Sequence, residues 1–376
     1  MLRNRLLPWF TLSALGVGAL AGCERASGTP PEARPAPPAP PVAVVTPPAR
    51  PAVPDASAVA KLAEHFFQTP RGQAPLPADT EAQVALGRML FHEPRLSKNH
   101  DVSCNSCHGL DTFGVDNKAL SDGHRGQKGS RNSPTVYNAA HHIAQFWDGR
   151  AATLEAQAEG PMMNPVEMAM PDAKRVEATL SSMPEYTARF RSAFPKERKP
   201  VTLAHAAKAL AAFERTLTTP SRFDRFLAGE HAALTPQEQR GLEAFITTGC
   251  TTCHNGPAVG GASFQKLGLV EAYPNLTDAG RFDATKNEDD RGYFRVPTLR
   301  NVEKTGPYLH DGSVKDLPTM VRLMGRYQLG RTLKDGEVED LEAFLKSLTG
   351  ELPPAERISA PPLPPSTKRT PEPDPS

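Results

Sequence analysis

Apolar residues recur at helical spacing through the middle of the chain. Four stretches carry this pattern most clearly, at residues 83–91, 201–217, 238–245 and 337–348. A repeat near 3.6 residues indicates helices that bury one face, and the last stretch stops at Gly350, a residue common at helix ends. Alternation typical of strands is rare. The pattern therefore predicts a mainly α-helical protein.

Proline divides the chain into a folded middle and two arms. The 376 residues include 39 prolines, of which eleven lie between Pro30 and Pro54 and nine between residues 353 and 376. Proline lacks a backbone N–H and disrupts helices and interior strands. We therefore expect a tether at residues 23–54, an unstructured tail at 353–376, and a folded region from 55 to 352.

The first residues have the features of an export signal. A basic start is followed by a mostly apolar run at residues 6–20 and then by Ala21-Gly22-Cys23. This order is typical of a secretory signal and is too short for a permanent membrane span. Because residues 20–23 resemble a bacterial lipobox, we expect a signal peptide at 1–22 and a lipid anchor at Cys23, with ordinary cleavage as the alternative. Glu24 resembles the outer-membrane sorting pattern, so the expected location is the periplasm, at the outer membrane.

Composition and charge exclude several classes of protein. Hydrophobic residues make up 39% and charged residues 23%, which excludes a polytopic membrane protein and a wholly disordered chain. The 43 basic and 42 acidic residues leave a net charge of +1. The balance gives no basic footprint, so no nucleic-acid partner is expected.

The other four cysteines form two matching motifs. They are Cys104-Asn-Ser-Cys107-His108 and Cys250-Thr-Thr-Cys253-His254. In c-type haem attachment, two such thiols bond the porphyrin and the adjacent histidine binds the iron. A four-cysteine zinc site or redox-active disulfides are alternatives, but the motifs lie 146 residues apart and each includes a histidine. The sequence predicts two covalent haem c groups.

The second axial ligand of each haem is less clear from spacing alone. His124 lies 16 residues after His108, in a glycine-rich loop that could cover the haem and also move away. An exposed histidine is the alternative. For the other haem, Met324 lies 70 residues after His254 at the end of an apolar stretch. Met320 competes for this role, and both methionines could equally fill the core.

Seven further groups of residues follow the first haem motif in a fixed order. They are Ser121-Asp-Gly-His124; Arg131-Asn132-Ser-Pro-Thr135; Phe146-Trp147-Asp-Gly-Arg150; Gln157, Pro161 and Asn164-Pro-Val-Glu167-Met168; Val296-Pro-Thr-Leu-Arg-Asn301; Pro307-Tyr-Leu-His-Asp-Gly312; and Met324-Gly-Arg-Tyr-Gln-Leu-Gly330. With the two haem motifs, they resemble the bacterial di-haem cytochrome c peroxidases from about residue 83 to 350.

The resemblance implies two cytochrome c-like haem domains. The N-terminal domain, at 55–217, would hold the peroxidatic haem with His108 and His124 as ligands. The C-terminal domain, at 218–352, would hold the electron-entry haem with His254 and Met324. Methionine ligation raises the reduction potential relative to two histidines, so electrons would first settle there. In many family members this reduction releases the second histidine of the peroxidatic haem, although here Arg125-Gly126 replaces the aromatic residue that often follows it.

The resemblance also implies roles for residues around the haems. Glu167 would be the general acid-base residue, Gln157 would position peroxide or water, and Trp147 would relay electrons between the haems. His310 would form hydrogen bonds near the second haem. A calcium ion would be bound by oxygens of Asn132, Thr305 and Pro307.

The expected activity is reduction of hydrogen peroxide to water by electrons from a small cytochrome c or a cupredoxin. Two alternatives are a di-haem enzyme that matures a partner protein and a non-catalytic electron-transfer cytochrome. The maturation enzymes carry tyrosine where this chain has Met324, and a plain cytochrome has no use for Gln157, Glu167 or a mobile His124. Whether the chain forms a homodimer stays open.

Overall fold

The computed structural model describes residues 52–69 and 79–376. The predicted signal peptide, Cys23 and most of the tether lie outside these residues. Within the described ranges, no helix is both long and apolar enough to cross a bilayer. The elements are α1 (Ala56–Ala63), α2 (Glu81–Phe91), α3 (Cys104–Cys107), α4 (Leu154–Met163), α5 (Ala173–Ser181), α6 (Pro184–Ala193), α7 (Leu203–Glu214), α8 (Arg222–Leu227), α9 (Pro236–Thr247), β1 (Phe264–Lys266), α10 (Phe282–Thr285), β2 (Tyr293–Arg295), α11 (Leu317–Leu329), α12 (Asp335–Ser347) and α13 (Ala355–Ile358).

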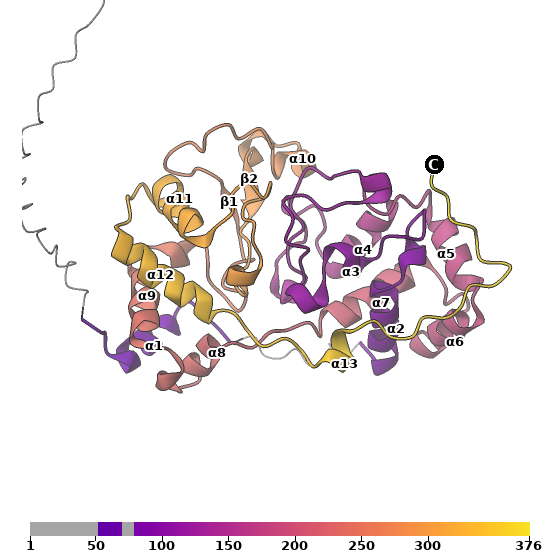
Figure 1. Cartoon of the computed structure of the whole chain (residues 1–376), viewed down its shortest axis with the longest axis horizontal. Coiled ribbons are helices and arrows are strands. Elements are labelled where there is room, and N and C mark those ends of the chain that lie inside the picture. Colours follow the sequence, from indigo (N-terminus) through magenta and orange to yellow (C-terminus); the bar gives the residue numbers. More distant parts are fainter. Residues whose placement is uncertain (1–51, 70–78) are drawn as a thin grey trace, which may run out of the picture. The chain divides into compact units, whose positions relative to one another are not determined.

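The mainly helical class is confirmed (Figure 1). The four predicted helices correspond to α2, α7, α9 and α12. Strands β1 and β2 pair antiparallel, with Phe264 opposite Arg295, and form one small sheet in the described part of the chain.

Two helix pairs repeat the same packing around glycine. A Cβ on Gly87 of α2 would lie 1.9 Å from the carbonyl oxygen of Ala209 in α7. A Cβ on Gly241 of α9 would likewise lie 1.9 Å from the carbonyl oxygen of Asp340 in α12. Only glycine permits such close contact between two helices. Each pair lies at the centre of a hydrophobic core, and each glycine-bearing helix precedes one haem motif.

Both of these leading helices begin in the same way. In α2 the Thr80 hydroxyl accepts a hydrogen bond from the backbone N–H of Gln83, whose side chain bonds back to Thr80. In α9 Thr235 and Glu238 make the reciprocal bonds. These capping boxes satisfy backbone donors that a helix start otherwise leaves open, so they fix where each helix begins and, with it, the position of the following cysteines.

Helix α1 departs from the predicted domain boundaries. Residues 55–217 were expected to form one unit, but α1 packs against α8 and α9. Val59 and Ala63 belong to the core that contains Phe223 and Phe245, and the Phe67 ring meets Phe223 edge-on at 5.2 Å. The boundary at residue 55 therefore does not follow the packing. The spacing of apolar residues shows that a helix buries one face, but it does not show which other helices that face packs against.

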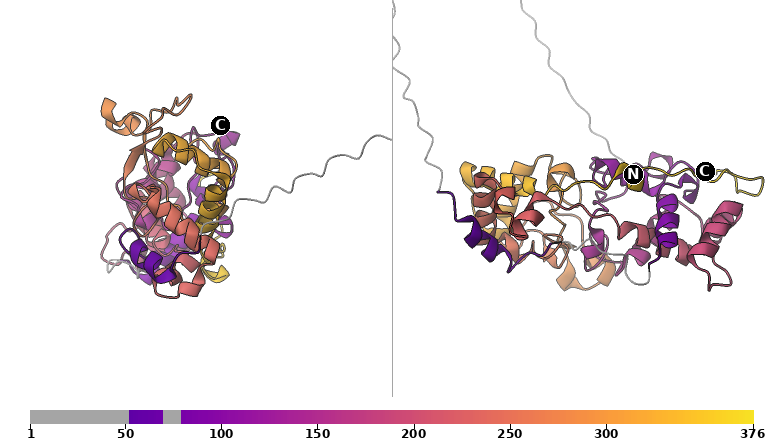
Figure 2. Two further views of the ribbon diagram at one scale, coloured as in Figure 1. Left: turned by 90° about the vertical axis from the view of Figure 1, so that its left-hand side faces the viewer. Right: turned by 90° about the horizontal axis from the view of Figure 1, so that it is seen from below.

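The prediction that residues 353–376 are unstructured is wrong. The segment forms α13, and Ile358 joins the hydrophobic core of α2 and α7 with 8% of its surface exposed. His92 Nε2 donates a hydrogen bond to the Ile358 carbonyl at 3.0 Å. The segment then continues as an extended strap to the C-terminus marked in Figures 1 and 2. Proline disfavours long helices and sheets, but an extended chain can still offer its carbonyls to side-chain donors.

Candidate haem sites and catalytic residues

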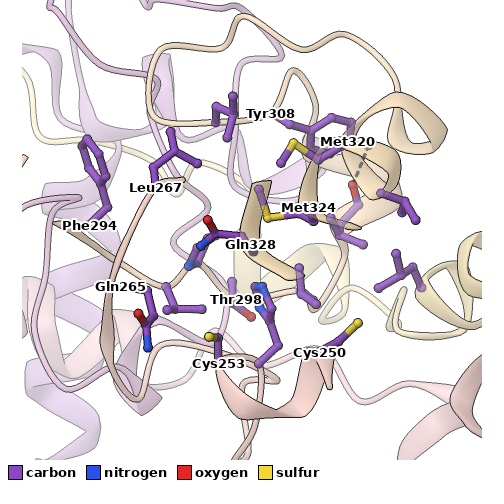
Figure 3. A pocket seen from close by; sticks show the side chains of 18 of the residues that line it. Cys250, Cys253, Gln265, Leu267, Phe294, Thr298, Tyr308, Met320, Met324 and Gln328 are labelled. Atoms are coloured by element: carbon purple, nitrogen blue, oxygen red, sulfur yellow. Dashed lines mark hydrogen bonds between the residues drawn. The ribbon is translucent and has the colours of Figure 1, made fainter. Parts of the chain in front are cut away.

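The second haem motif opens into an apolar cavity of about 220 Å³. We call this cavity, with Cys250, Cys253 and His254, the Cys250 site. It is lined on the opposite side by Met320 and Met324 of α11 (Figure 3). Two thiols, an imidazole and a thioether around an apolar space match the donor set of a covalently bound haem c with histidine and methionine ligands. The residues present therefore fit the group.

The turn after α9 sets the geometry of the Cys250 site. Gly249 has φ 97°, a left-handed conformation that favours glycine, and ends the helix before Cys250. The backbone N–H of His254 then bonds to the Cys250 carbonyl at 3.0 Å, which keeps the histidine beside the cysteine turn. Burial lowers the pKa of His254 to about 4. The imidazole is thus neutral at physiological pH, the form that binds metals.

The two candidate methionines lie four residues apart on α11, and both line the cavity. Figure 3 draws Met324 between Met320 and the turn that carries Cys250 and Cys253. Met324 also packs against the hydrophobic cluster that includes Trp147. The sequence interpretation of Met324 as ligand stays a prediction, with Met320 as its competitor.

The first haem motif forms a separate site, here called the Cys104 site. Cys104 and Cys107 bound the short helix α3, and His108 follows directly. His108 Nδ1 lies 3.3 Å from the Gly114 carbonyl, which orients the ring and leaves Nε2 for a ligand. Burial lowers the pKa of His108, so this imidazole is also in its neutral form.

The alternatives for the cysteines fit the structure poorly. In the part of the chain that the structure describes, no three His, Cys, Asp or Glu side chains gather in a metal-binding cluster. Burial raises the pKa of Cys104 and of Cys250 to about 12. Redox-active pairs contain a cysteine of low pKa, the opposite condition. Neither a zinc site nor a thiol-disulfide centre is therefore supported.

Glu167 lies in the surroundings of the Cys104 site. Asn164 Nδ2 donates a hydrogen bond to Glu167 Oε1 at 2.9 Å. Burial raises the pKa of Glu167, while the nearby charge of Arg150 and the Asn164 bond lower it. Cys107 is close enough for the Glu167 charge to contribute to its pKa, which burial chiefly raises. A carboxyl group with a raised pKa suits proton transfer near neutral pH.

The loop that carries His124 packs on the same segment. The His124 backbone N–H bonds to the Glu167 carbonyl at 2.7 Å. A Cβ on Gly123 would lie 2.1 Å from the Val166 carbonyl oxygen, so this contact requires glycine. Gln157 is partly buried on α4, the helix that leads directly into Asn164. The structure therefore brings Glu167 and His124 together, and places Gln157 on the neighbouring helix.

The ring of His124 has a partner that the sequence did not predict. His124 is only 3% exposed, and its Nε2 lies 3.1 Å from the carbonyl oxygen of Ser376. Its Nδ1 is buried without a hydrogen-bond partner. No motif marks this contact, because the two residues lie 252 positions apart.

Trp147 comes from the sequence region of the Cys104 site but lines the cavity of the Cys250 site. Its indole Nε1 donates a hydrogen bond to the Asn132 carbonyl at 2.9 Å. Its ring packs with Phe294 and meets His310 edge-on at a centroid distance of 6.4 Å. Trp147 is thus held in the Cys250 site although it follows the first haem motif in the sequence.

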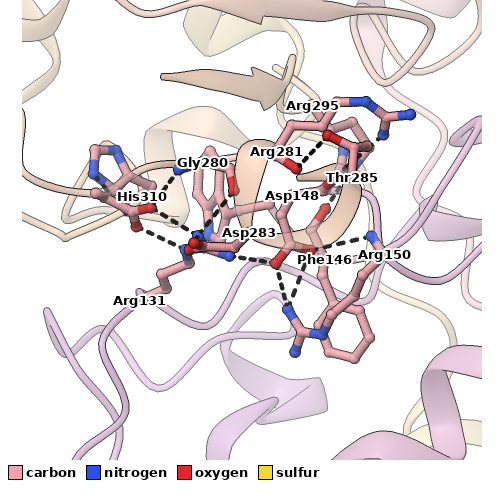
Figure 4. A network of polar contacts seen from close by, with 12 residues as sticks. Arg131, Phe146, Asp148, Arg150, Gly280, Arg281, Asp283, Thr285, Arg295 and His310 are labelled. Carbon is pink, nitrogen blue, oxygen red and sulfur yellow. Dashed lines mark hydrogen bonds and ion pairs between the residues drawn. The ribbon is translucent and has the colours of Figure 1, made fainter. Parts of the chain in front are cut away.

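A charged network fixes the segments on either side of Trp147 (Figure 4). Arg131 Nη1 donates to Asp148 at 2.6 Å, and Arg131 Nε and Nη2 donate to the two carboxylate oxygens of Asp278 at 2.7 Å. Arg150 also donates to Asp148 and lies over the Phe146 ring at 3.5 Å. Paired guanidinium and carboxylate groups of this kind are geometrically specific. Asp278 is a positioning residue that the sequence analysis missed, since no motif surrounds it.

The three residues assigned to calcium share one cavity lining. Asn132, Thr305 and Pro307 all line the cavity of the Cys250 site. Asn132 Nδ2 donates to the carbonyls of Lys118 and Ala119, at 2.9 and 3.3 Å. The amide nitrogen is thereby engaged, so only the amide oxygen of this side chain could bind a cation. Oxygen donors of this type suit calcium.

Comparison with known proteins identifies the family of the chain. The di-haem cytochrome c peroxidase family model matches residues 81–232. Cytochrome c551 peroxidase of Pseudomonas aeruginosa is 48% identical over 300 residues, which cover 78% of this chain and 85% of that protein. The Nitrosomonas europaea cytochrome c551 peroxidase is 46% identical over 318 residues, covering 84% and 92%. A crystal structure of a MauG-like protein associated with microbial copper homeostasis superposes with a TM-score of 0.71 at 31% identity, covering 78% of this chain and 98% of that one. The chain belongs to the di-haem cytochrome c peroxidase family.

Proposed function

We propose that this cytochrome c peroxidase accepts electrons at the Cys250 site and reduces hydrogen peroxide at the Cys104 site. Each site would form the centre of one cytochrome c-like domain. When bound, the two haem c groups would supply electron storage and an iron that binds peroxide. The observation that carries the proposal is Trp147, which follows the Cys104 site in sequence yet lines the cavity of the Cys250 site.

His254 and Met324 would hold the iron at the Cys250 site, and His108 and His124 at the Cys104 site. The electron donor would be a small cytochrome c or a cupredoxin. Met324 supports this reading over the partner-maturing alternative, whose enzymes carry tyrosine at this place. Glu167 and a movable His124 have no use in a cytochrome that only transfers electrons.

Glu167 would move the protons of the reaction. Reduction of one hydrogen peroxide to two waters consumes two electrons and two protons. The Glu167 carboxylate would take a proton from one peroxide oxygen and deliver it to the other as the O–O bond breaks. The Asn164 hydrogen bond fixes the orientation of the carboxylate, and Gln157 would hold the peroxide or water within its reach.

Donor turnover tests the proposed activity directly. Reduced cytochrome c or cupredoxin, mixed with the haem-loaded protein and peroxide, should lose two electrons for each peroxide consumed. An enzyme that matures a partner protein would leave the donor reduced. If no peroxide is consumed with any small donor, the proposal is wrong.

Replacing His124 by glycine should give a peroxidatic haem that is high-spin even in the fully oxidised protein. Glycine supplies no ligand, so the sixth position would stay open without prior reduction. Electron paramagnetic resonance and visible spectra report this change. Arg125→Gly in the same loop is the matched control and should stay low-spin. An unchanged low-spin spectrum of His124→Gly would show that another residue is the ligand.

We also propose a calcium ion bound by Asn132, Thr305 and Pro307. Calcium there would fix the Asn132 segment, whose carbonyl holds Trp147. Removing calcium with a chelator should therefore slow electron transfer between the haems, and adding calcium back should restore the rate. The rate is followed by stopped-flow spectroscopy, and a calcium-independent rate would argue against the site.

The chain would work in the periplasm, attached to the outer membrane through Cys23. The lipobox-like residues 20–23 support this proposal. The exported protein should partition into the detergent phase, and Cys23→Ser should move it to the aqueous phase. Aqueous partition of both proteins would rule out the lipid anchor.

A further inference from the structure

The C-terminal strap follows a defined path across the helices of the Cys104 site. Beyond α13, the Ser366 hydroxyl accepts a hydrogen bond from Arg95 at 3.0 Å. Thr370 is buried, and its hydroxyl lies 2.8 Å from that of Ser182. The Glu372 carbonyl accepts a bond from Arg175 at 2.7 Å. These side-chain contacts guide the strap past α5 toward its end (Figures 1 and 2).

Lys98 holds the end of the strap. The Asp374 backbone N–H bonds to the Lys98 carbonyl at 2.9 Å, and the Lys98 ammonium lies 3.4 Å from the Asp374 carboxylate. The same ammonium donates to the Ser376 carbonyl oxygen at 2.8 Å. Ser376 is fixed further by its N–H, which bonds to Asp374 Oδ1 at 2.9 Å. The main-chain oxygen of Ser376 that contacts His124 is thus also bound by Lys98.

The contact between Ser376 and His124 excludes iron binding through the same atom. The main-chain oxygen of Ser376 accepts this hydrogen bond, so His124 Nε2 carries the hydrogen. A nitrogen that donates this hydrogen has no lone pair for a metal. The remaining nitrogen, Nδ1, is buried without a partner. Because the His124 backbone is bound to Glu167, the imidazole ring is the part that can be redirected.

We propose that residues 372–376 act as a latch that positions His124. By accepting the Nε2 hydrogen, the latch withdraws Nε2 from iron ligation and favours an open peroxidatic site. The proposal rests on the proposed role of His124 as an iron ligand. It adds a conformational control that the strap supplies from the far end of the sequence.

Two variants of the haem-loaded protein test the latch. One ends at Pro371 and lacks the latch residues. The other, Lys98→Met, keeps the length of the side chain but loses the ammonium that holds Ser376. Lys368→Met, an exposed lysine of the strap, is the matched control. The measured quantity is the spin state of the peroxidatic haem in the half-reduced protein. Near-infrared magnetic circular dichroism measures it, and this method separates bis-histidine from histidine-methionine ligation.

Both variants should raise the ratio of low-spin to high-spin peroxidatic haem about 2- to 10-fold, the range expected for loss of one hydrogen bond. Lys368→Met should leave the ratio unchanged. Truncation in a His124→Gly background should have no effect, since the latch then has nothing to hold. An unchanged or lower ratio in both variants would overturn the latch. Failure of His124→Gly alone to become high-spin would instead refute His124 as the ligand.

Discussion

Replacing Glu167 by glutamine is expected to lower kcat/KM for hydrogen peroxide by about 10²- to 10⁴-fold, the usual contribution of general acid-base catalysis. Glutamine keeps the size of the side chain and can still contact Asn164, but it cannot accept and return a proton. The haem spectra should therefore stay as in the wild type while turnover collapses. Steady-state oxidation of a reduced donor at varied peroxide concentration measures the effect.

The pH dependence gives this substitution a second signature. Burial raises the pKa of Glu167, so the catalytic carboxylate is lost as pH falls through a value above the usual carboxyl range. Wild-type activity should therefore fall at acidic pH, and the remaining activity of Glu167→Gln should not show this fall. The matched control is Glu159→Gln, on the neighbouring helix α4. It removes the same charge, but it should keep the wild-type turnover rate and the loss of activity at acidic pH. A Glu167→Gln rate within a few fold of wild type would contradict the assignment.

The sequence predicted the helices and the haem motifs because each depends on neighbouring residues. Helical spacing, capping residues and the Cys-x-x-Cys-His pattern all act within a few positions of the chain. The helices α2 and α9 were thus correctly placed before their cysteines. Glycines 87 and 241 were not singled out, since their importance lies in the approach of a distant helix.

The remaining features depend on contacts between distant segments. Helix α1 packs against α8 and α9, across more than 150 residues of sequence, and Asp278 meets Arg131 across 147 positions. The proline-rich strap was predicted to be unstructured because proline content excludes regular structure. Its order comes instead from side chains such as Arg95, Arg175 and Lys98, whose positions only the fold reveals.

A polar network runs from the surroundings of Glu167 to His310, and no single sequence motif marks it. Arg150 lies near Glu167 and donates to Asp148. Asp148 pairs with Arg131, and Arg131 in turn pairs with Asp278, whose carboxylate lies 3.9 Å from His310. Partly buried pairs of this kind hold defined geometry at the cost of removing charge from water. These pairs hold Asp148, the neighbour of Trp147 in the sequence, against Arg131 and Arg150.

Replacing Met324 by leucine is expected to lower the reduction potential of the electron-entry haem by on the order of 0.1 V, a fraction of the range that axial ligands span. The thioether favours the reduced iron, and leucine offers no donor atom. At 59 mV for each tenfold change in a one-electron equilibrium, such a drop reduces electron uptake about 50-fold. Because leucine and methionine have similar volumes, the fold should persist. Spectroelectrochemical titration measures the potential.

Met320→Leu, one turn earlier in the same cavity, is the matched control and should leave the reduction potential near the wild-type value. The reverse outcome, a drop only in Met320→Leu, would make Met320 the ligand and require α11 to present its other methionine to the iron.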